Sequence, residues 1–271
     1  MNTRFVLRGL MVALPAAAIA TAIGFTVMNL HAQIGPPPDP TPLPPTILAA
    51  RGQLPTGPVV FQEWARHRDG SYDLKGCGFL LGVSDGQVVG VTTAHSLSLG
   101  DPNQPLERIG LRVAGRTEFV AQFDRLHGQP GQPRTGDDLT VDYVLLQPSR
   151  PIEPDLVLQP DPRGAPQPGE RVSLFNGLGG DGDAGDGQLV LEGTVQSASE
   201  TAVWVLMDAW FNPALMSGSA FISQHTGQPV GMLIAGTIRG RRLLLGAHPI
   251  GSIVHLAESA TEFPRLSEYR E

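Results

Sequence analysis

The sequence is poor in cysteine and has no excess of positive charge. Cys77 is the one cysteine among 271 residues, so the chain can form no disulfide bond within itself. A core of this size does not need disulfide bonds, and we interpret Cys77 as a small, buried strand residue. The net charge of −7 argues against a nucleic-acid partner, because phosphate binding needs clustered lysine and arginine. The one basic cluster, at residues 239–242, is interpreted as a solvated hairpin turn.

Long helical patterns are also missing between residues 55 and 245. With 33 glycines and 25 prolines, turns are frequent, and short β-branched or apolar runs lie between them. These features predict an all-β protein. The runs form two sets separated by a proline-rich break at residues 147–169. We expect strands at residues 59–64, 77–83, 87–93, 108–113, 118–123 and 140–146, and then at residues 171–175, 188–195, 202–208, 219–223, 229–235 and 242–247.

The two sets of runs predict two lobes, at residues 55–150 and 151–262, each with the strands of a six-stranded antiparallel β-barrel. Residues 250–259 have a periodic apolar face, which predicts a short C-terminal helix. We interpret residues 263–271 as a C-terminal tail.

Residues 1–32 differ from the rest of the chain. Arg4 and Arg8 precede an uncharged apolar run at residues 9–30, a pattern that directs the following chain outward across a membrane. The segment is either a cleaved signal peptide or a signal anchor, because the run is long enough to span a bilayer. In both cases we expect a periplasmic or extracellular protein, held at the cytoplasmic membrane if the anchor remains. The proline-rich residues 33–54 predict a stiff linker.

Ser217 carries the pattern of a serine nucleophile on a tight turn. Small residues follow it, Gly218 and Ser219, and a strand-like apolar run at residues 229–236 comes next. A serine hydroxyl is a poor nucleophile unless a base activates it and a third group orients that base.

His95 and Asp142 are the candidates for those two roles. Each lies at one end of a strand-like run, where a side chain can reach a cleft. Asp137 and Asp138 are alternatives for the acid. We prefer Asp142 because the apolar run after it would anchor it, whereas the other two lie in a predicted turn.

In these three motifs the chain resembles the chymotrypsin-like (trypsin-like) serine proteases of the bacterial exported type. The family signatures are Thr-Ala-Ala-His, Asp-Ile-Ala-Leu-Leu and Gly-Asp-Ser-Gly-Gly-Pro, and this chain has Thr-Thr-Ala-His at residues 92–95, Asp-Tyr-Val-Leu-Leu at residues 142–146 and Met-Ser-Gly-Ser at residues 216–219. The order His, Asp, Ser and the spacing agree with that family, and the resemblance covers about residues 55–260.

The resemblance implies a chymotrypsin-like pair of barrels with His95, Asp142 and Ser217 as a catalytic triad between them. It also implies an oxyanion hole formed by the backbone N–H groups of Leu215 and Ser217. The family usually has glycine where this chain has Leu215, and glycine tolerates backbone angles that leucine disfavours. Met216 replaces the aspartate on which activation by propeptide cleavage depends, so we expect no such activation.

The same resemblance assigns substrate binding to Phe211, Ile234, Ala235 and Gly236. Residue 211 is not acidic, so we expect no preference for cleavage after lysine or arginine. A shallow apolar pocket for small or medium side chains is expected instead. Family members of animal origin pair a cysteine near position 77 with one just after the histidine, where this chain has Ser96.

The sequence therefore predicts an exported serine endopeptidase that acts on protein or peptide substrates through an acyl-enzyme. The alternative is a catalytically impaired pseudoprotease that serves as a membrane-tethered binding module. No cofactor or metal is expected. Asp181, Asp183 and Asp186 offer oxygen ligands, but their spacing departs from a calcium loop, so we interpret residues 179–187 as a flexible acidic hairpin loop.

Overall fold

The computed structural model describes residues 52–101, 105–179 and 188–269, which all belong to one compact unit. The predicted leader at residues 1–32, most of the predicted linker and the acidic residues of the loop at 179–187 lie outside the described residues. Within the described residues, which do not include the apolar run at residues 9–30, no helix is long and apolar enough to cross a membrane.

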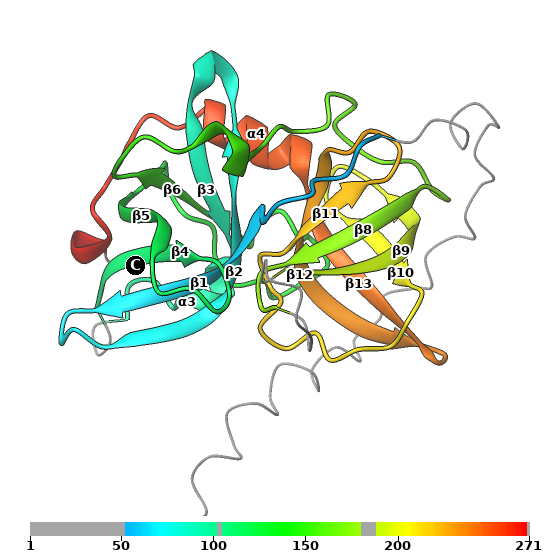
Figure 1. Cartoon of the computed structure of the whole chain (residues 1–271), viewed down its shortest axis with the longest axis horizontal. Coiled ribbons are helices and arrows are strands. Elements are labelled where there is room, and N and C mark those ends of the chain that lie inside the picture. The colour runs from blue at the N-terminus through cyan, green and yellow to red at the C-terminus, as the bar shows by residue number, and fades with distance from the viewer. Residues whose placement is uncertain (1–51, 102–104, 180–187, 270–271) are drawn as a thin grey trace, which may run out of the picture. The chain divides into compact units, whose positions relative to one another are not determined.

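The first barrel contains six antiparallel strands (Figure 1). They are β1 (Val60–His67), β2 (Tyr72–Gly82), β3 (Val88–Thr92), β4 (Leu106–Arg112), β5 (Phe119–Leu126) and β6 (Val144–Pro148). Their order is β1-β4-β5-β6-β3-β2, and the antiparallel pairing of β2 with β1 closes the sheet. A two-residue strand, β7 (Val157–Leu158), adds to β2 in parallel. The single-turn helices η1 (Ser84–Gly86), α3 (Ala94–Leu97) and η2 (Pro154–Leu156) lie in the connections.

The second barrel is also closed and has six strands. They are β8 (Arg171–Asn176), β9 (Leu189–Ala198), β10 (Val203–Met207), β11 (Ala220–Ser223), β12 (Pro229–Arg239) and β13 (Arg242–Pro249), in the order β10-β13-β12-β11-β8-β9. The helix α4 (Ile250–Glu258) follows directly. The predicted all-β architecture of two six-stranded barrels and a short C-terminal helix is confirmed. The basic cluster forms the β12–β13 hairpin turn, as expected, with Arg239 opposite Arg242.

Side chains alternate between the two faces of each strand, so one sheet contributes side chains to two hydrophobic cores. In β2, Leu80 points into the core of the first barrel, whereas its neighbours Phe79 and Leu81 join a second cluster. That second cluster also receives Phe175 and Ile222 from the other barrel, so it forms the contact between the two. The side chains enclosed by the second barrel form a third cluster, which includes Val172, Leu174, Val205, Phe221 and Leu245.

Strand β6 begins later than the sequence predicts. The run at residues 140–146 suggested that Asp142 opens a strand, but β6 starts at Val144 and Asp142 lies in the turn before it. The reason is that the buried Asp142 carboxylate accepts backbone N–H groups from Ala94, His95 and Arg134, which is incompatible with a side chain directed along a regular ladder.

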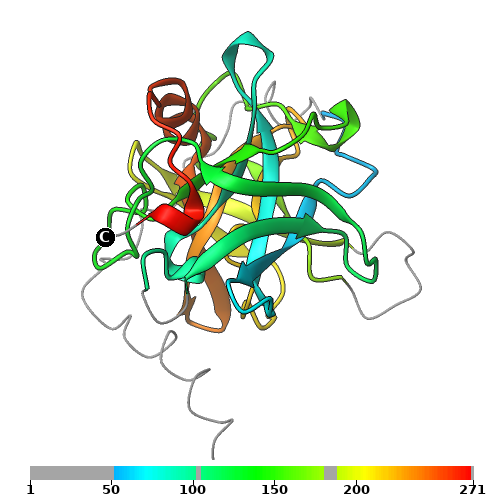
Figure 2. The same ribbon diagram turned by 90° about the vertical axis from the view of Figure 1, so that its left-hand side faces the viewer.

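The chain after α4 returns to the first barrel. The backbone N–H of Leu126 donates to the carbonyl of Pro264 at 2.9 Å, and Leu266 of η3 (Leu266–Glu268) is buried in the core of the first barrel. Figure 2 shows this last segment, in red, against the strands of that barrel. The C-terminal residues therefore pack against the first barrel, although they follow the second in sequence.

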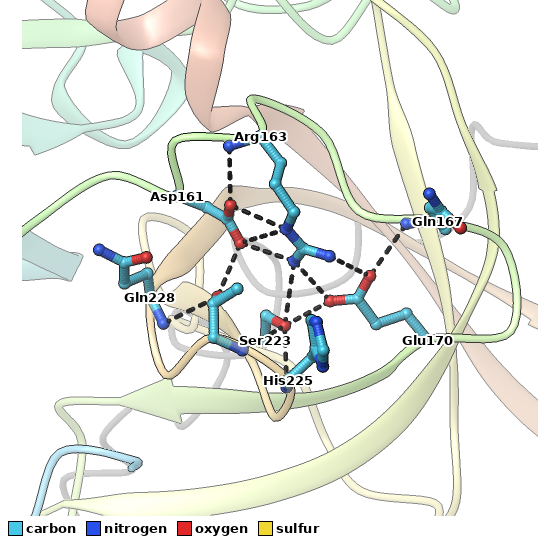
Figure 3. A network of polar contacts seen from close by, with 8 residues as sticks. Asp161, Arg163, Gln167, Glu170, Ser223, His225 and Gln228 are labelled. Atoms are coloured by element: carbon cyan, nitrogen blue, oxygen red, sulfur yellow. Dashed lines mark hydrogen bonds and ion pairs between the residues drawn. The ribbon is translucent and has the colours of Figure 1, made fainter. Parts of the chain in front are cut away.

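A buried ionic network fixes the segment between the barrels to the second barrel (Figure 3). Arg163 donates to Asp161 at 2.6 Å and to Glu170 at 2.8 Å, and both carboxylates are buried. Thr226, in the β11–β12 turn, donates to Asp161 at 2.7 Å, and Ser223 donates to Glu170. Burial raises the pKa values of both carboxyl groups, but the hydrogen bonds from these partners outweigh burial and lower them overall.

Replacing Arg163 tests this network. Arg163→Ala leaves two buried carboxylates without their cation, and removal of one partner from a buried pair costs about 3–5 kcal/mol. We expect a fall of that size in the free energy of unfolding, measured by urea denaturation at pH 7. Arg171→Ala is the matched control, because its partners Glu192 and Asp208 are 58% and 42% exposed. Exposed pairs contribute about 0–1 kcal/mol each, so equal losses in the two variants would contradict this account.

Candidate active site

His95 lies in the short helix α3, directly after β3 of the first barrel. The helix begins beside the Asp142 carboxylate, whose Oδ1 accepts the backbone N–H of Ala94 at 2.9 Å and of His95 at 3.1 Å. The first N–H groups of a helix have no partner within the helix, and an aspartate is a preferred acceptor for them. Asp142 thus holds the backbone that carries His95.

The structure brings His95, Asp142 and Ser217 together. His95 Nδ1 lies 2.8 Å from Asp142 Oδ2, and His95 Nε2 lies 2.8 Å from Ser217 Oγ. An ionised carboxylate only accepts hydrogen bonds, so Nδ1 carries the proton and Nε2 is free to accept the serine proton. The Asp142 side chain is 1% exposed and the His95 side chain 25% exposed, so solvent or a ligand reaches the imidazole from one side.

The charge of Asp142 is stabilised by its surroundings. Burial raises its pKa, but the hydrogen bond and charge of His95, with the backbone N–H groups of His95 and Arg134, outweigh burial and lower the pKa below its usual value. Asp138, one of the alternatives, instead accepts the backbone N–H and hydroxyl of Thr140. The side chain that contacts His95 is therefore Asp142.

Ser217 is held between the two barrels. Its carbonyl accepts the N–H of Cys77 in β2 at 2.8 Å, and the next N–H, of Gly218, donates to the carbonyl of Leu233 in β12 at 2.9 Å. Gly218 has φ +87°, and a Cβ there would lie 1.9 Å from the carbonyl oxygen of Cys77. Glycine is required at this position for both reasons.

Two backbone donors of the serine turn have no acceptor among the described residues. The turn uses four N–H groups in hydrogen bonds to the chain, those of Ala214, Met216, Gly218 and Ser219. The N–H groups of Leu215 and Ser217 donate to no described group. Free N–H groups two residues apart beside a nucleophile are the donors that an oxyanion hole needs.

Comparison with known proteins supports the fold. In sequence, the chain matches no protein-family model and no curated protein. In structure, it is similar to a mutant of human heparin binding protein, with a TM-score of 0.53, 15% identity and coverage of 78% of this chain and 94% of the other. With two closed six-stranded barrels, this likeness decides the architecture. The chain has the chymotrypsin-like fold.

Two further structures of this fold are similar at a TM-score of 0.49. One is a thermostable serine protease from an extremophilic microorganism, at 12% identity over 75% of this chain and 97% of the other. The other is Kallikrein-related peptidase 10, at 19% identity over 75% of this chain and 95% of the other.

Leu215 adopts a backbone conformation that glycine tolerates better than leucine does. Its φ is +63°, in the left-handed region, and its side chain is half exposed. Such a conformation costs a residue with a Cβ about 1–2 kcal/mol. The Pro213 carbonyl accepts the N–H of Met216 at 3.1 Å, and the Leu215 carbonyl accepts the Cys77 thiol at 3.6 Å. These contacts hold the strained peptide in place.

Cys77 is a buried residue of β2, as the sequence predicts. Burial raises the pKa of its thiol to about 11, so the thiolate that a cysteine nucleophile needs is scarce at neutral pH. Ser96 hydrogen-bonds the hydroxyl of Thr93 at 2.6 Å.

The residues predicted to bind substrate lie on two segments. Ile234, Ala235 and Gly236 belong to β12, and Phe211 lies in the loop after β10. The Ile234 side chain is buried in the cluster between the barrels. A Cβ on Gly236 would lie 2.9 Å from Leu245 Cδ2 and 3.9 Å from Pro213 Cγ, so these two side chains take up the space in front of Gly236.

The sequence analysis did not identify Leu245 as the neighbour of Gly236, although the pairing of the hairpin predicts this contact. The β12–β13 turn sets Arg239 opposite Arg242, and counting back along the hairpin places Gly236 opposite Leu245. The residue opposite Gly236 lies on the same face of the sheet as Gly236.

The strain at Leu215 yields a test. Leu215→Gly and Leu215→Ala both remove the half-exposed side chain, but only glycine relieves the positive φ. We expect the glycine variant to be more stable than the alanine variant by about 1 kcal/mol, measured by urea denaturation. An alanine variant of equal or greater stability would show that the peptide changes conformation instead.

Proposed function

We propose that this chain is an exported serine endopeptidase. The observation that carries the proposal is the position of His95, hydrogen-bonded to Asp142 on one side and to Ser217 on the other. The N–H groups of Leu215 and Ser217, which have no acceptor in the described part of the chain, support it, because they provide donors on the turn that carries the hydroxyl.

In the proposed reaction, Ser217 Oγ attacks a peptide carbonyl while His95 Nε2 takes the hydroxyl proton. The N–H groups of Leu215 and Ser217 stabilise the oxyanion that forms, and the Asp142 carboxylate stabilises the imidazolium. The tetrahedral intermediate then expels the amine, which receives the proton from His95 and leaves an acyl-enzyme. Water attacks this ester in the same way, again giving its proton to His95, and releases the acid and Ser217.

The leader supports export of the catalytic unit. Arg4 and Arg8 ahead of the apolar run at residues 9–30 are typical of a segment that sends the following chain across a membrane. We infer a periplasmic or extracellular location, with or without a retained anchor. The substrates proposed are proteins or peptides.

Covalent labelling tests the triad. A fluorophosphonate forms a stable ester with an activated serine, so we expect one adduct on Ser217 by intact-mass analysis. Ser217→Ala abolishes the adduct because the attacking oxygen is gone, and His95→Ala reduces the labelling rate at least about 100-fold because general-base catalysis contributes about 10²–10⁴-fold. Thr201→Ala, which removes an exposed hydroxyl that is not part of the triad, is expected to label as the parent does.

One feature of the serine turn favours a second function, that of a catalytically impaired binding module. Leu215 holds a strained φ in the proposed oxyanion turn, and loss of one such donor costs about 2.7–4 kcal/mol. The structure with the TM-score of 0.53 is that of a protein named for binding heparin. A folded protein without any adduct would favour the binding module over the peptidase.

The side chains in front of Gly236 predict which residues the protein cleaves after. We expect cleavage after small residues such as alanine, because Leu245 and Pro213 fill the position where a larger side chain would extend. Leu245→Val enlarges this space, so its cleavage profile on a peptide library should shift towards larger residues. Leu244→Val removes the same volume from the cluster between the barrels and should leave the profile unchanged.

A further inference from the structure

Glu63 is a buried acid that the proposed reaction does not use. It lies in the middle of β1, opposite Gly76 of β2 and Leu111 of β4, and its exposed fraction is 0%. Neither carboxyl oxygen has a hydrogen-bond partner within the described residues. A buried polar group without a partner costs about 1–3 kcal/mol, so its presence beside a candidate active site calls for a physical reason.

The Glu63 carboxyl and the Ser217 carbonyl oxygen border the same small space beside Gly76. The position that a Cβ of Gly76 would take is bordered by three oxygens: the Ser217 carbonyl oxygen at 2.9 Å, Ser96 Oγ at 3.4 Å and Glu63 Oε2 at 3.6 Å. The next residue along β2, Cys77, donates its N–H to that same Ser217 carbonyl. Glu63 therefore lies next to the contact by which the first barrel holds Ser217.

The groups around Glu63 come from four elements. On β2, these are the Lys75 ammonium and the Cys77 thiol; on β3, the Thr92 hydroxyl, which donates to the Cys77 carbonyl at 3.0 Å. On α3, Ser96 faces the site, whereas the His95 ring is turned to Asp142 and Ser217. On β4, the residue opposite is Leu111, and the Arg112 guanidinium lies over the Trp64 ring instead.

We propose that Glu63 is a positioning residue for Ser217, which keeps the serine turn in its reactive arrangement while its carboxyl is protonated and disturbs it when the proton is lost. This inference rests on the proposed function. A protonated carboxyl has an O–H that can be directed at the carbonyl or hydroxyl oxygens facing it. An ionised carboxylate only accepts hydrogen bonds, so it would place negative charge in the space that the Ser217 carbonyl oxygen also borders.

The protonation state changes in an accessible range of pH. Burial raises the pKa of Glu63 to about 8, outweighing the lowering influence of Thr92 and Lys75. The folded protein therefore holds the proton through neutral pH. Because the folded-state pKa lies above the unfolded value, the folded state loses stability as pH rises from about 4.5 to about 8.

The pH dependence of Ser217 labelling tests the proposal. In the unmodified protein, we expect the fluorophosphonate rate constant to fall about tenfold between pH 7 and pH 9, because about a tenth of Glu63 remains protonated one pH unit above its pKa. Glu63→Gln keeps an N–H donor at every pH, so its rate should not fall over this range. Glu192→Gln, which replaces an exposed carboxylate, should behave as the unmodified protein does.

Two readouts separate this proposal from the proposed function. Amide NMR signals of Cys77 and Gly218 should shift with a midpoint near pH 8 in the unmodified protein, whether or not Ser217 reacts, and should not do so in Glu63→Gln. Signals that stay still from pH 7 to pH 9, or an equal loss of labelling rate in Glu63→Gln, would overturn the role of Glu63. Absence of labelling at pH 7 with the NMR shifts present would overturn the peptidase and leave the positioning role standing.

Discussion

A single buried carboxylate organises the candidate site. Asp142 accepts hydrogen bonds from the backbone of Ala94, His95 and Arg134 and from the His95 ring. A carboxylate that is 1% exposed needs this many donors to remain ionised, and meeting that need orients both the helix that carries His95 and its imidazole. The start of β6 is displaced for the same reason. The need to stabilise the Asp142 charge thus determines the backbone around α3, the tautomer of His95 and the side from which the imidazole is accessible.

The second constraint is the contact between the barrels. Ser217 accepts a hydrogen bond from β2 of the first barrel, and Gly218 donates one to Leu233 of the second. The chain passes so close to Cys77 that residue 218 can have no Cβ, and the turn before it forces Leu215 to a positive φ. The apolar cluster between the barrels holds these elements in register, so neither barrel by itself contains the complete arrangement.

Besides Asp142, the described residues contain two sets of buried acidic side chains, and the charge of each set is dealt with in a different way. Asp161 and Glu170 are paired by Arg163 and hydroxyl donors, so their charges remain and tie the inter-barrel segment down. Glu63 has no hydrogen-bond partner among the described residues and keeps its proton instead. A paired acid confers rigidity over a wide range of pH, whereas an unpaired one makes its surroundings depend on pH. Because of this contrast, we assign a structural role to Asp161 and Glu170 and a positioning role to Glu63.

The sequence alone determined the all-β class, the two sets of strands and the three side chains that meet in the site, because strand-like runs between turns and the order of the three motifs can be read directly from the sequence. Local pattern could not show that the N–H groups of Leu215 and Ser217 have no acceptor among the described residues, nor that Glu63 and the Ser217 carbonyl border the same space. It also placed Asp142 in a strand, whereas Asp142 precedes the strand and accepts hydrogen bonds from the α3 backbone. These features join residues 47 or more positions apart or depend on the backbone angle of one residue. Only the closure of both barrels and their packing against each other decide them.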